Sequence, residues 1–154
     1  MHVTLWRHGE AGPASRDADR ALTERGRGAL VVTLSRFKAE LSRLGVEPPS
    51  VCLHSPLVRT TQTAELLATD LAIPAQVLSA LAPGARVAES QALVEGHDAH
   101  VILVTHQPFV SDLLGYWLDN DGLDFLEPGG WATLDLLVPS RGGASLKHME
   151  ARMT

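Results

Sequence analysis

Three short apolar runs in this sequence each lead into residues that can bind or attack a phosphoryl group. Arg7 and His8 follow the first run, Arg59 comes shortly after the second, and His106 follows the third. Arginine presents a planar fork of donors to phosphate oxygens, and a neutral imidazole is a competent nucleophile toward phosphorus. These residue types predict phosphoryl transfer if the fold brings them into one small volume.

The apolar runs are predicted to be strands because they are short and bounded by polar or turn-forming residues. The run 101–104 is continuously apolar and β-branched, which is typical of a strand covered on both faces of a parallel sheet. A hairpin is predicted near the end of the chain. The predicted strands cover residues 3–6, 51–53, 76–78, 101–104, 131–138 and 145–149.

Helices are predicted between these strands from apolar residues at helical spacing. Thr23 can cap the first helix, which is expected to stop before Gly45. Serine as cap and proline at the first position predict that the second helix begins at Ser55-Pro56. A weaker pattern predicts a helix over 86–95, and Pro108 suits the start of the last one.

Strands that alternate with helices imply an α/β fold. The prediction is a three-layer sandwich with a mostly parallel central sheet, which the hairpin at the C-terminal end makes mixed. A chain of 154 residues fits one compact domain, spanning 1–154, with a core of ample size.

In open α/β sheets, ligands bind beyond the carboxyl ends of the strands. If the three strands are neighbours, Arg7, His8, Arg59 and His106 meet at one such edge. Helix amino termini near Ser55 and Gln107 would add backbone donors, with Gln107 beside the substrate. The positive groups in this set make a metal unnecessary, so we expect neither metal nor cofactor.

His8 needs its second ring nitrogen fixed, so that the attacking nitrogen keeps a free lone pair. A backbone carbonyl in the following turn is the natural partner. Gly9 permits a tight turn there and a close approach of the chain to the phosphoryl group.

Composition excludes some other functions. The formal net charge of −5 lacks the basic footprint of a nucleic-acid-binding protein. No apolar stretch approaches the roughly 18 residues of a membrane helix, and the amino terminus lacks the shape of a signal peptide. The one cysteine, Cys52, lies in an apolar run and is predicted to be a buried thiol. We therefore expect a cytoplasmic protein, of undefined oligomeric state, that contacts neither membranes nor nucleic acids.

The motifs resemble those of a known family. Arg7-His8-Gly9-Glu10-Ala11 is similar to the defining motif of the histidine phosphatase superfamily, which includes phosphoglycerate mutases and acid phosphatases. The segments 20–26, 55–64 and 104–108 resemble further blocks of that family, in the family's order. The short chain and the form Arg-His-Gly-Glu-Ala resemble the SixA-type branch, which removes phosphate from phosphohistidine in proteins.

The resemblance implies a phosphoglycerate mutase-like fold and an order for the strands. It also implies that His8 is the nucleophile that becomes transiently phosphorylated, with Arg7, Arg59 and His106 completing the phosphate pocket. The partner would be a protein carrying phosphohistidine or a small phosphorylated molecule.

One departure from the family affects the substrate. Many larger members carry a mid-chain acid that protonates an alcohol leaving group, whereas residues 77–83 here contain no carboxylate, and Glu89 and Glu95 come later. A nitrogen leaving group depends less on such an acid, so the leading hypothesis is hydrolysis of phosphohistidine or a related phosphoramidate. The alternatives are a small-molecule phosphomonoesterase and a non-catalytic module that binds phosphohistidine.

The remaining polar residues are given simpler interpretations. His54 is expected to be structural, and His97 and His100 to lie in a solvated loop, since no third metal ligand is near at suitable spacing. The roles of Arg20 and Glu10 stay open. The side chains of Trp117 and Trp131 are expected in the core.

Overall fold

The computed structural model describes residues 1–153 and contains one six-stranded sheet with the order β3-β2-β4-β1-β5-β6. The strands β1 to β4 pair in parallel, whereas β5 runs antiparallel to both β1 and β6. The predicted mixed sheet with a C-terminal hairpin is therefore confirmed. The strands are β1 (His2–Arg7), β2 (Val51–His54), β3 (Ala75–Val77), β4 (Val101–Thr105), β5 (Trp131–Leu136) and β6 (Ala144–Glu150).

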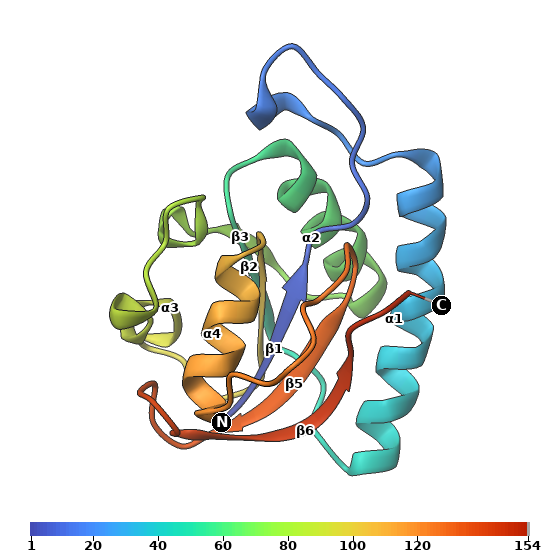
Figure 1. The fold of residues 1–154 in the computed structure, drawn as a ribbon. Coiled ribbons are helices and arrows are strands. Elements are labelled where there is room, and N and C mark those ends of the chain that lie inside the picture. Colours follow the sequence, from blue (N-terminus) through green and yellow to red (C-terminus); the bar gives the residue numbers. More distant parts are fainter. Residues whose placement is uncertain (154) are drawn as a thin grey trace.

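Helices cover both faces of this sheet, as the three-layer prediction requires (Figure 1). The helices α1 (Glu24–Leu44) and α2 (Val58–Leu71) pack on one face. On the other face lie α4 (Phe109–Leu118) and the segment that contains the short helix α3 (Gln91–Val94). Three single 3-10 turns, η1 (Asp17–Asp19), η2 (Ser79–Leu81) and η3 (Val87–Glu89), lie in the connections.

Alternation along each strand divides the core between the two faces. In β4, Val101 and Leu103 join the cluster under α4, whereas Ile102 and Val104 join the cluster under α1 and α2. This is why the run is apolar throughout. Cys52 is also fully buried, and burial raises the pKa of its thiol to about 12, so it packs as a small apolar residue.

An aromatic cluster fixes α1 against the sheet. Trp6 and Phe37 have ring centroids 5.1 Å apart, and Phe37 and Trp131 have centroids 5.0 Å apart, both with edge-on geometry. All three side chains are fully buried, as is Trp117 on the other face, so the expectation that Trp117 and Trp131 are core residues is confirmed.

The ends of α1 are those predicted. Thr23 accepts a hydrogen bond from the Gly26 amide at 2.9 Å, which satisfies a donor that the first helical turn leaves free. At the other end Gly45 adopts a left-handed conformation with φ of 66°, the usual glycine stop signal.

Two helix predictions need correction. The second helix begins at Val58 and not at Ser55-Pro56. The Ser55 hydroxyl accepts from the Leu57 amide ahead of the helix and also bonds the His106 ring. The predicted helix over 86–95 is broken into η3 and α3. The last helix begins at Phe109, directly after Pro108, as expected to within one residue.

His100 does not lie in a solvated loop as predicted. Its ring is fully buried and bonds the Thr4 hydroxyl and the Glu47 carbonyl, each at 2.8 Å. His97 is partly buried and its neighbour Asp98 is exposed. Among residues 1–153 no helix is both long and apolar enough to cross a bilayer.

The two glycines in the first turns of α1 provide a test of the local packing. A Cβ on Gly26 would collide with the carbonyl oxygen of Glu10, whereas a Cβ on Gly28 would meet nothing within 4 Å. We expect Gly28→Ala to raise the free energy of unfolding by roughly 0.5–1 kcal/mol through helix propensity. Gly26→Ala should lower the free energy of unfolding despite the same gain in propensity.

Urea denaturation monitored by circular dichroism measures both effects. Equal stabilisation by the two substitutions would contradict the close approach of Glu10 to the helix.

Candidate active site

The site is built where β1, β2 and β4 end side by side. In the parallel register Arg7 lies opposite Thr105, and His54 lies opposite Val104. The chain stays paired for one more residue, since the His8 amide donates to the Thr105 carbonyl at 3.2 Å. The predicted neighbourhood of the three strand ends is therefore confirmed.

The His8 ring is held by the turn that follows it. Its Nδ1 lies 2.8 Å from the Gly9 carbonyl oxygen, and because a carbonyl can only accept, Nδ1 carries the proton. This leaves the lone pair on Nε2, as the sequence predicted. Gly9 is needed there, because a Cβ would lie 2.8 Å from a methyl carbon of Leu30.

Thr63 connects this turn to the helix that carries Arg59. Its hydroxyl accepts from the Gly9 amide at 3.0 Å and donates to the Arg59 carbonyl at 2.8 Å. The hydroxyl is fully buried, so both bonds are shielded from water. The position of His8 and the position of Arg59 are therefore coupled through one side chain.

His106 lies across the site from His8, with ring centroids 5.4 Å apart. Its Nε2 lies 2.7 Å from the Ser55 hydroxyl, which also accepts from the Leu57 amide at 3.3 Å. The Ser55 oxygen has a second lone pair as well as its hydrogen, so the bond to His106 can form with either ring tautomer. When the hydroxyl donates to Nε2, His106 carries its proton on Nδ1, which is then a donor at the site.

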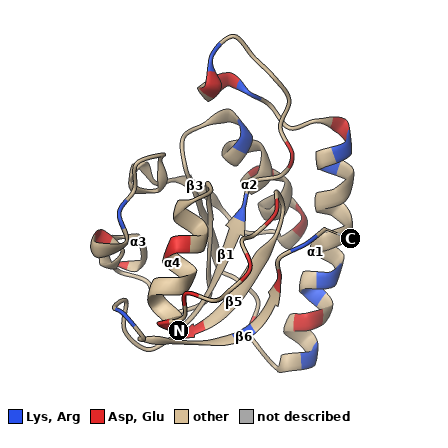
Figure 2. Ribbon diagram, viewed as in Figure 1, with Lys and Arg blue, Asp and Glu red and all other residues tan. Residues whose placement is uncertain are grey.

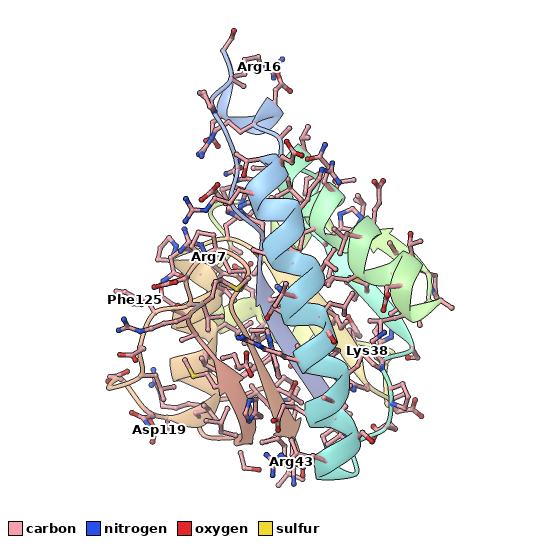
Figure 3. The ribbon with its side chains drawn as sticks, turned by 90° about the vertical axis from the view of Figure 1, so that its right-hand side faces the viewer. Arg7, Arg16, Lys38, Arg43, Asp119 and Phe125 are labelled. Atoms are coloured by element: carbon pink, nitrogen blue, oxygen red, sulfur yellow. The ribbon has the colours of Figure 1, made fainter. Side chains whose placement is uncertain are left out.

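Two arginines bring positive charge to the same edge. Figure 2 shows basic segments at the upper end of β1 and in the first turn of α2, and Figure 3 labels Arg7 there. Arg7 donates to the Leu126 carbonyl at 2.9 Å, and Arg59 donates to the Asp17 carbonyl at 2.9 Å and carboxylate at 3.1 Å. Burial, followed by the charge of Arg59, lowers the pKa of Arg7.

Buried polar atoms without a protein partner gather at this edge. Within residues 1–153 five such side-chain atoms occur, and one of them, Trp6 Nε1, belongs to the core. The other four are Arg7 Nε, Arg59 Nε, His106 Nδ1 and Gln107 Nε2. Buried donors normally have partners, so this group is suited to binding an anion. Four of the six sequence-predicted site residues, Arg7, Arg59, His106 and Gln107, thus contribute unpartnered donors to this edge.

Both imidazoles are uncharged at neutral pH. Burial, followed by the charges of Arg59 and Arg7, lowers the pKa of His8 to about 4, although the bond to Gly9 opposes this shift. Burial, followed by the neighbouring His8 and the charges of Arg59 and Arg7, lowers the pKa of His106 to about 4, although Asp17 opposes this shift. The two arginines therefore carry the positive charge, and His8 keeps its lone pair available.

Residues 77–83, where the family resemblance leads us to expect a mid-chain acid, contain no carboxylate. Leu81 of η2 is fully buried, and its carbonyl accepts from the Thr105 hydroxyl at 2.7 Å at the end of β4. Glu89 is exposed and lies 3.9 Å from Arg86, and Glu95 is exposed as well. Within the part of the chain that the structure describes, no cluster of three or more metal-ligating side chains occurs.

Contacts indicate a role for Glu10, which the sequence left open, and for His54, which was expected to be structural. Glu10 accepts from the Thr23 hydroxyl at 2.8 Å and so supports the start of α1. His54 is buried, and its Nδ1 lies 2.8 Å from the Ser55 carbonyl, which agrees with the structural role predicted for it.

Sequence reasoning missed Thr63 and Asp17. Thr63 stands four residues after Arg59, a spacing that places both on one helical face and was available as a signal. Asp17 contacts Arg59 from a segment 42 residues earlier in the chain, for which the sequence gives no local signal.

Two arginines and two neutral imidazoles at the carboxyl edge of a parallel sheet are typical of a hydrolase that acts on phosphoryl groups. Comparison with known proteins agrees. Residues 3–83 match the model of the histidine phosphatase superfamily, branch 1. The chain belongs to this superfamily, and its fold is similar to that of SixA-type members.

The most informative structural relative is the protein histidine phosphatase SixA solved with tungstate. It is 26% identical, with a TM-score of 0.75, over 98% of this chain and 97% of the other. A mycobacterial glucosyl-3-phosphoglycerate phosphatase, at 20% identity and a TM-score of 0.69 over 98% and 99% of the two chains, shares the fold. An uncharacterized protein of Picosynechococcus sp. is 35% identical over 127 residues, which are 77% of this chain and 72% of the relative.

The protonation state of His8 can be measured directly. We expect its ring to titrate with a midpoint near the pKa of about 4, well below the ordinary 6.5, because burial and two arginines disfavour the imidazolium. Nuclear magnetic resonance of the ring carbon or nitrogen atoms as a function of pH gives the midpoint, and His8→Gln assigns the signal. A midpoint at or above the ordinary value would contradict the electrostatics of the site.

Proposed function

We propose that this protein is a phosphatase that hydrolyses phosphohistidine through a covalent phospho-His8 intermediate. The observation that carries the proposal is the 2.8 Å bond from His8 Nδ1 to the Gly9 carbonyl, which leaves Nε2 free beside two arginines. A ring held in this way has one reactive nitrogen in one orientation.

In this proposal the phosphoryl oxygens are bound by Arg7 and Arg59, with the Gln107 amide and the Nδ1–H of His106 as further donors. Gly9 allows the chain to approach them closely. Phosphoryl transfer needs in-line attack and compensation of charge on the equatorial oxygens. The four unpartnered donors at this edge support that assignment.

In the first step His8 Nε2 attacks phosphorus, and the bond from phosphorus to the leaving nitrogen breaks. The leaving imidazole departs as a neutral ring when its far nitrogen already carries a proton. In the second step water attacks phosphorus, the bond to Nε2 breaks, and the electron pair returns to Nε2. Both protons of the water stay on the phosphate.

The same hydrogen bond serves both steps. Because Nδ1 keeps its proton throughout, His8 leaves as a neutral imidazole and needs no acid of its own. An alcohol oxygen would leave as an alkoxide unless a strong acid protonated it. The lack of a carboxylate in residues 77–83 therefore favours cleavage of P–N over P–O bonds.

The similarity to a protein histidine phosphatase that binds tungstate supports the same substrate class. Independence from metal ions is part of the proposal, since the arginines and imidazoles supply the donors. A cytoplasmic setting, in which the buried Cys52 stays reduced, is part of it as well.

A comparison of substrates in the presence of a chelator tests the proposal. A phosphohistidine protein, free phosphohistidine, phosphoramidate and a panel of sugar phosphates are assayed side by side. We expect kcat/KM for the esters to be at least about a hundredfold lower, the usual contribution of a general acid. His8→Asn should abolish turnover of every substrate while the fold is retained.

Preference for esters would contradict the proposal and indicate a phosphomonoesterase. A requirement for a divalent ion would contradict the proposed independence from metal ions. Tight binding of vanadate without turnover of any substrate would indicate a module that binds phosphohistidine. Full activity of folded His8→Asn would contradict the covalent mechanism.

A further inference from the structure

The segment between β1 and α1 forms an arm that projects beyond the carboxyl edge of the sheet (Figure 1, dark blue). We define the arm as residues 11–22. Its base is a short ribbon, with a bridge between Ala11 and Leu22 and a bond from the Gly12 amide to the Ala21 carbonyl at 2.8 Å. Its tip contains η1, and Figure 3 shows Arg16 at the far end, well above Arg7.

From this arm Asp17 reaches Arg59 with two groups at once. Its carbonyl oxygen lies 2.9 Å from Arg59 Nη1, and its carboxylate lies 3.1 Å from Nη2. The Arg59 side chain is only 8% exposed, whereas that of Asp17 is 65% exposed. A surface carboxylate therefore pairs with a buried arginine, which is the partner that needs a counter-charge.

The two contacts use one N–H on each terminal nitrogen of Arg59. A guanidinium has five N–H donors in one plane, so three stay available, including the buried Nε–H that has no protein partner. Contacts to both terminal nitrogens fix the plane of the guanidinium. The Nε–H and the other unused donors are left for a ligand.

Contacts of Arg20 within the arm hold Asp17 in place. Arg20 folds back onto the arm and donates to the carbonyls of Gly12 at 2.9 Å and Ala11 at 3.2 Å. It also lies 3.4 Å from the second carboxylate oxygen of Asp17. The Asp17 carboxylate therefore contacts Arg20 of the arm with one oxygen and Arg59 of the site with the other.

We infer that Asp17 is a positioning residue for the phosphoryl pocket, which orients Arg59 from the arm and makes the arm part of the site. This inference rests on the proposed function of the same pocket. Because Asp17 acts through Arg59, its removal should weaken binding of any phosphoryl group, whatever the leaving group.

The test uses vanadate as an analogue of the pentacoordinate transition state. We expect Asp17→Ala to raise the inhibition constant of vanadate about tenfold, the order of effect of a hydrogen bond to a charged group. The value of kcat/KM should fall at least as much for free phosphohistidine as for a phosphohistidine protein. Asp17→Asn keeps the carbonyl contact and one side-chain acceptor and should restore part of the loss.

Asp19→Ala is the matched control. Asp19 lies on the same arm and is 58% exposed, but its charged neighbour is Arg16 at 3.9 Å, and it makes no salt bridge to Arg59. This variant should bind vanadate like the wild type. The melting temperature of Asp19→Ala should be unchanged. That of Asp17→Ala should fall, because buried Arg59 loses its counter-charge, while its circular dichroism spectrum at the assay temperature should match that of the wild type.

Other outcomes separate the inference from the proposed function. Tighter vanadate binding by Asp17→Ala would make Asp17 a competitor for Arg59 and overturn the inference. A loss confined to the protein substrate would make the arm a docking element and overturn it too. If the wild-type protein does not bind vanadate, the proposed function itself is contradicted.

Discussion

The site depends on the parallel pairing of β1 and β2 with β4. This pairing sets Arg7 opposite Thr105 and His54 opposite Val104, so three segments far apart in sequence leave the sheet at one edge. The cores on the two faces hold the register, since a shift of one residue would exchange the apolar side chains between faces. Fixed strand ends then allow short bonds, such as those through Thr63 and Ser55, to hold His8, Arg59 and His106 in place.

Burial and the neighbouring positive charges act in the same direction on the groups at this edge, because both lower the pKa values of His8, His106 and Arg7. Burial keeps both imidazoles neutral, which leaves the lone pair that the proposed nucleophile His8 requires at neutral pH. The arginines cannot lose their charge in this way and must be compensated. Arg59 is compensated by Asp17, whereas Arg7 has the Leu126 carbonyl and, at longer range, the charge of Glu127. In the proposed function a phosphoryl group completes this balance, so the local cluster of arginines would allow a protein of net negative charge to bind an anion.

Much of this could be predicted from the sequence, because the signals were local. The ends of α1 at Thr23 and Gly45 and the three strand-end motifs follow from neighbouring residues. The incorrect predictions concern residues whose hydrogen-bond partners are distant in the chain. Ser55 was predicted to cap a helix, but its hydroxyl bonds His106, and His100 is buried by contacts with Thr4 and Glu47. The order of the strands came from the family resemblance, since local pattern does not encode which strands become neighbours.

The central claim is that His8 reacts through Nε2 because Nδ1 is bound to the Gly9 carbonyl. The most direct test is to trap the phosphoenzyme by rapid quenching into alkali and to determine, by phosphorus nuclear magnetic resonance and peptide mapping, which nitrogen carries phosphorus. The account predicts phosphorus on Nε2 of His8 alone. Phosphorus on Nδ1 of His8, or on another residue, would contradict it.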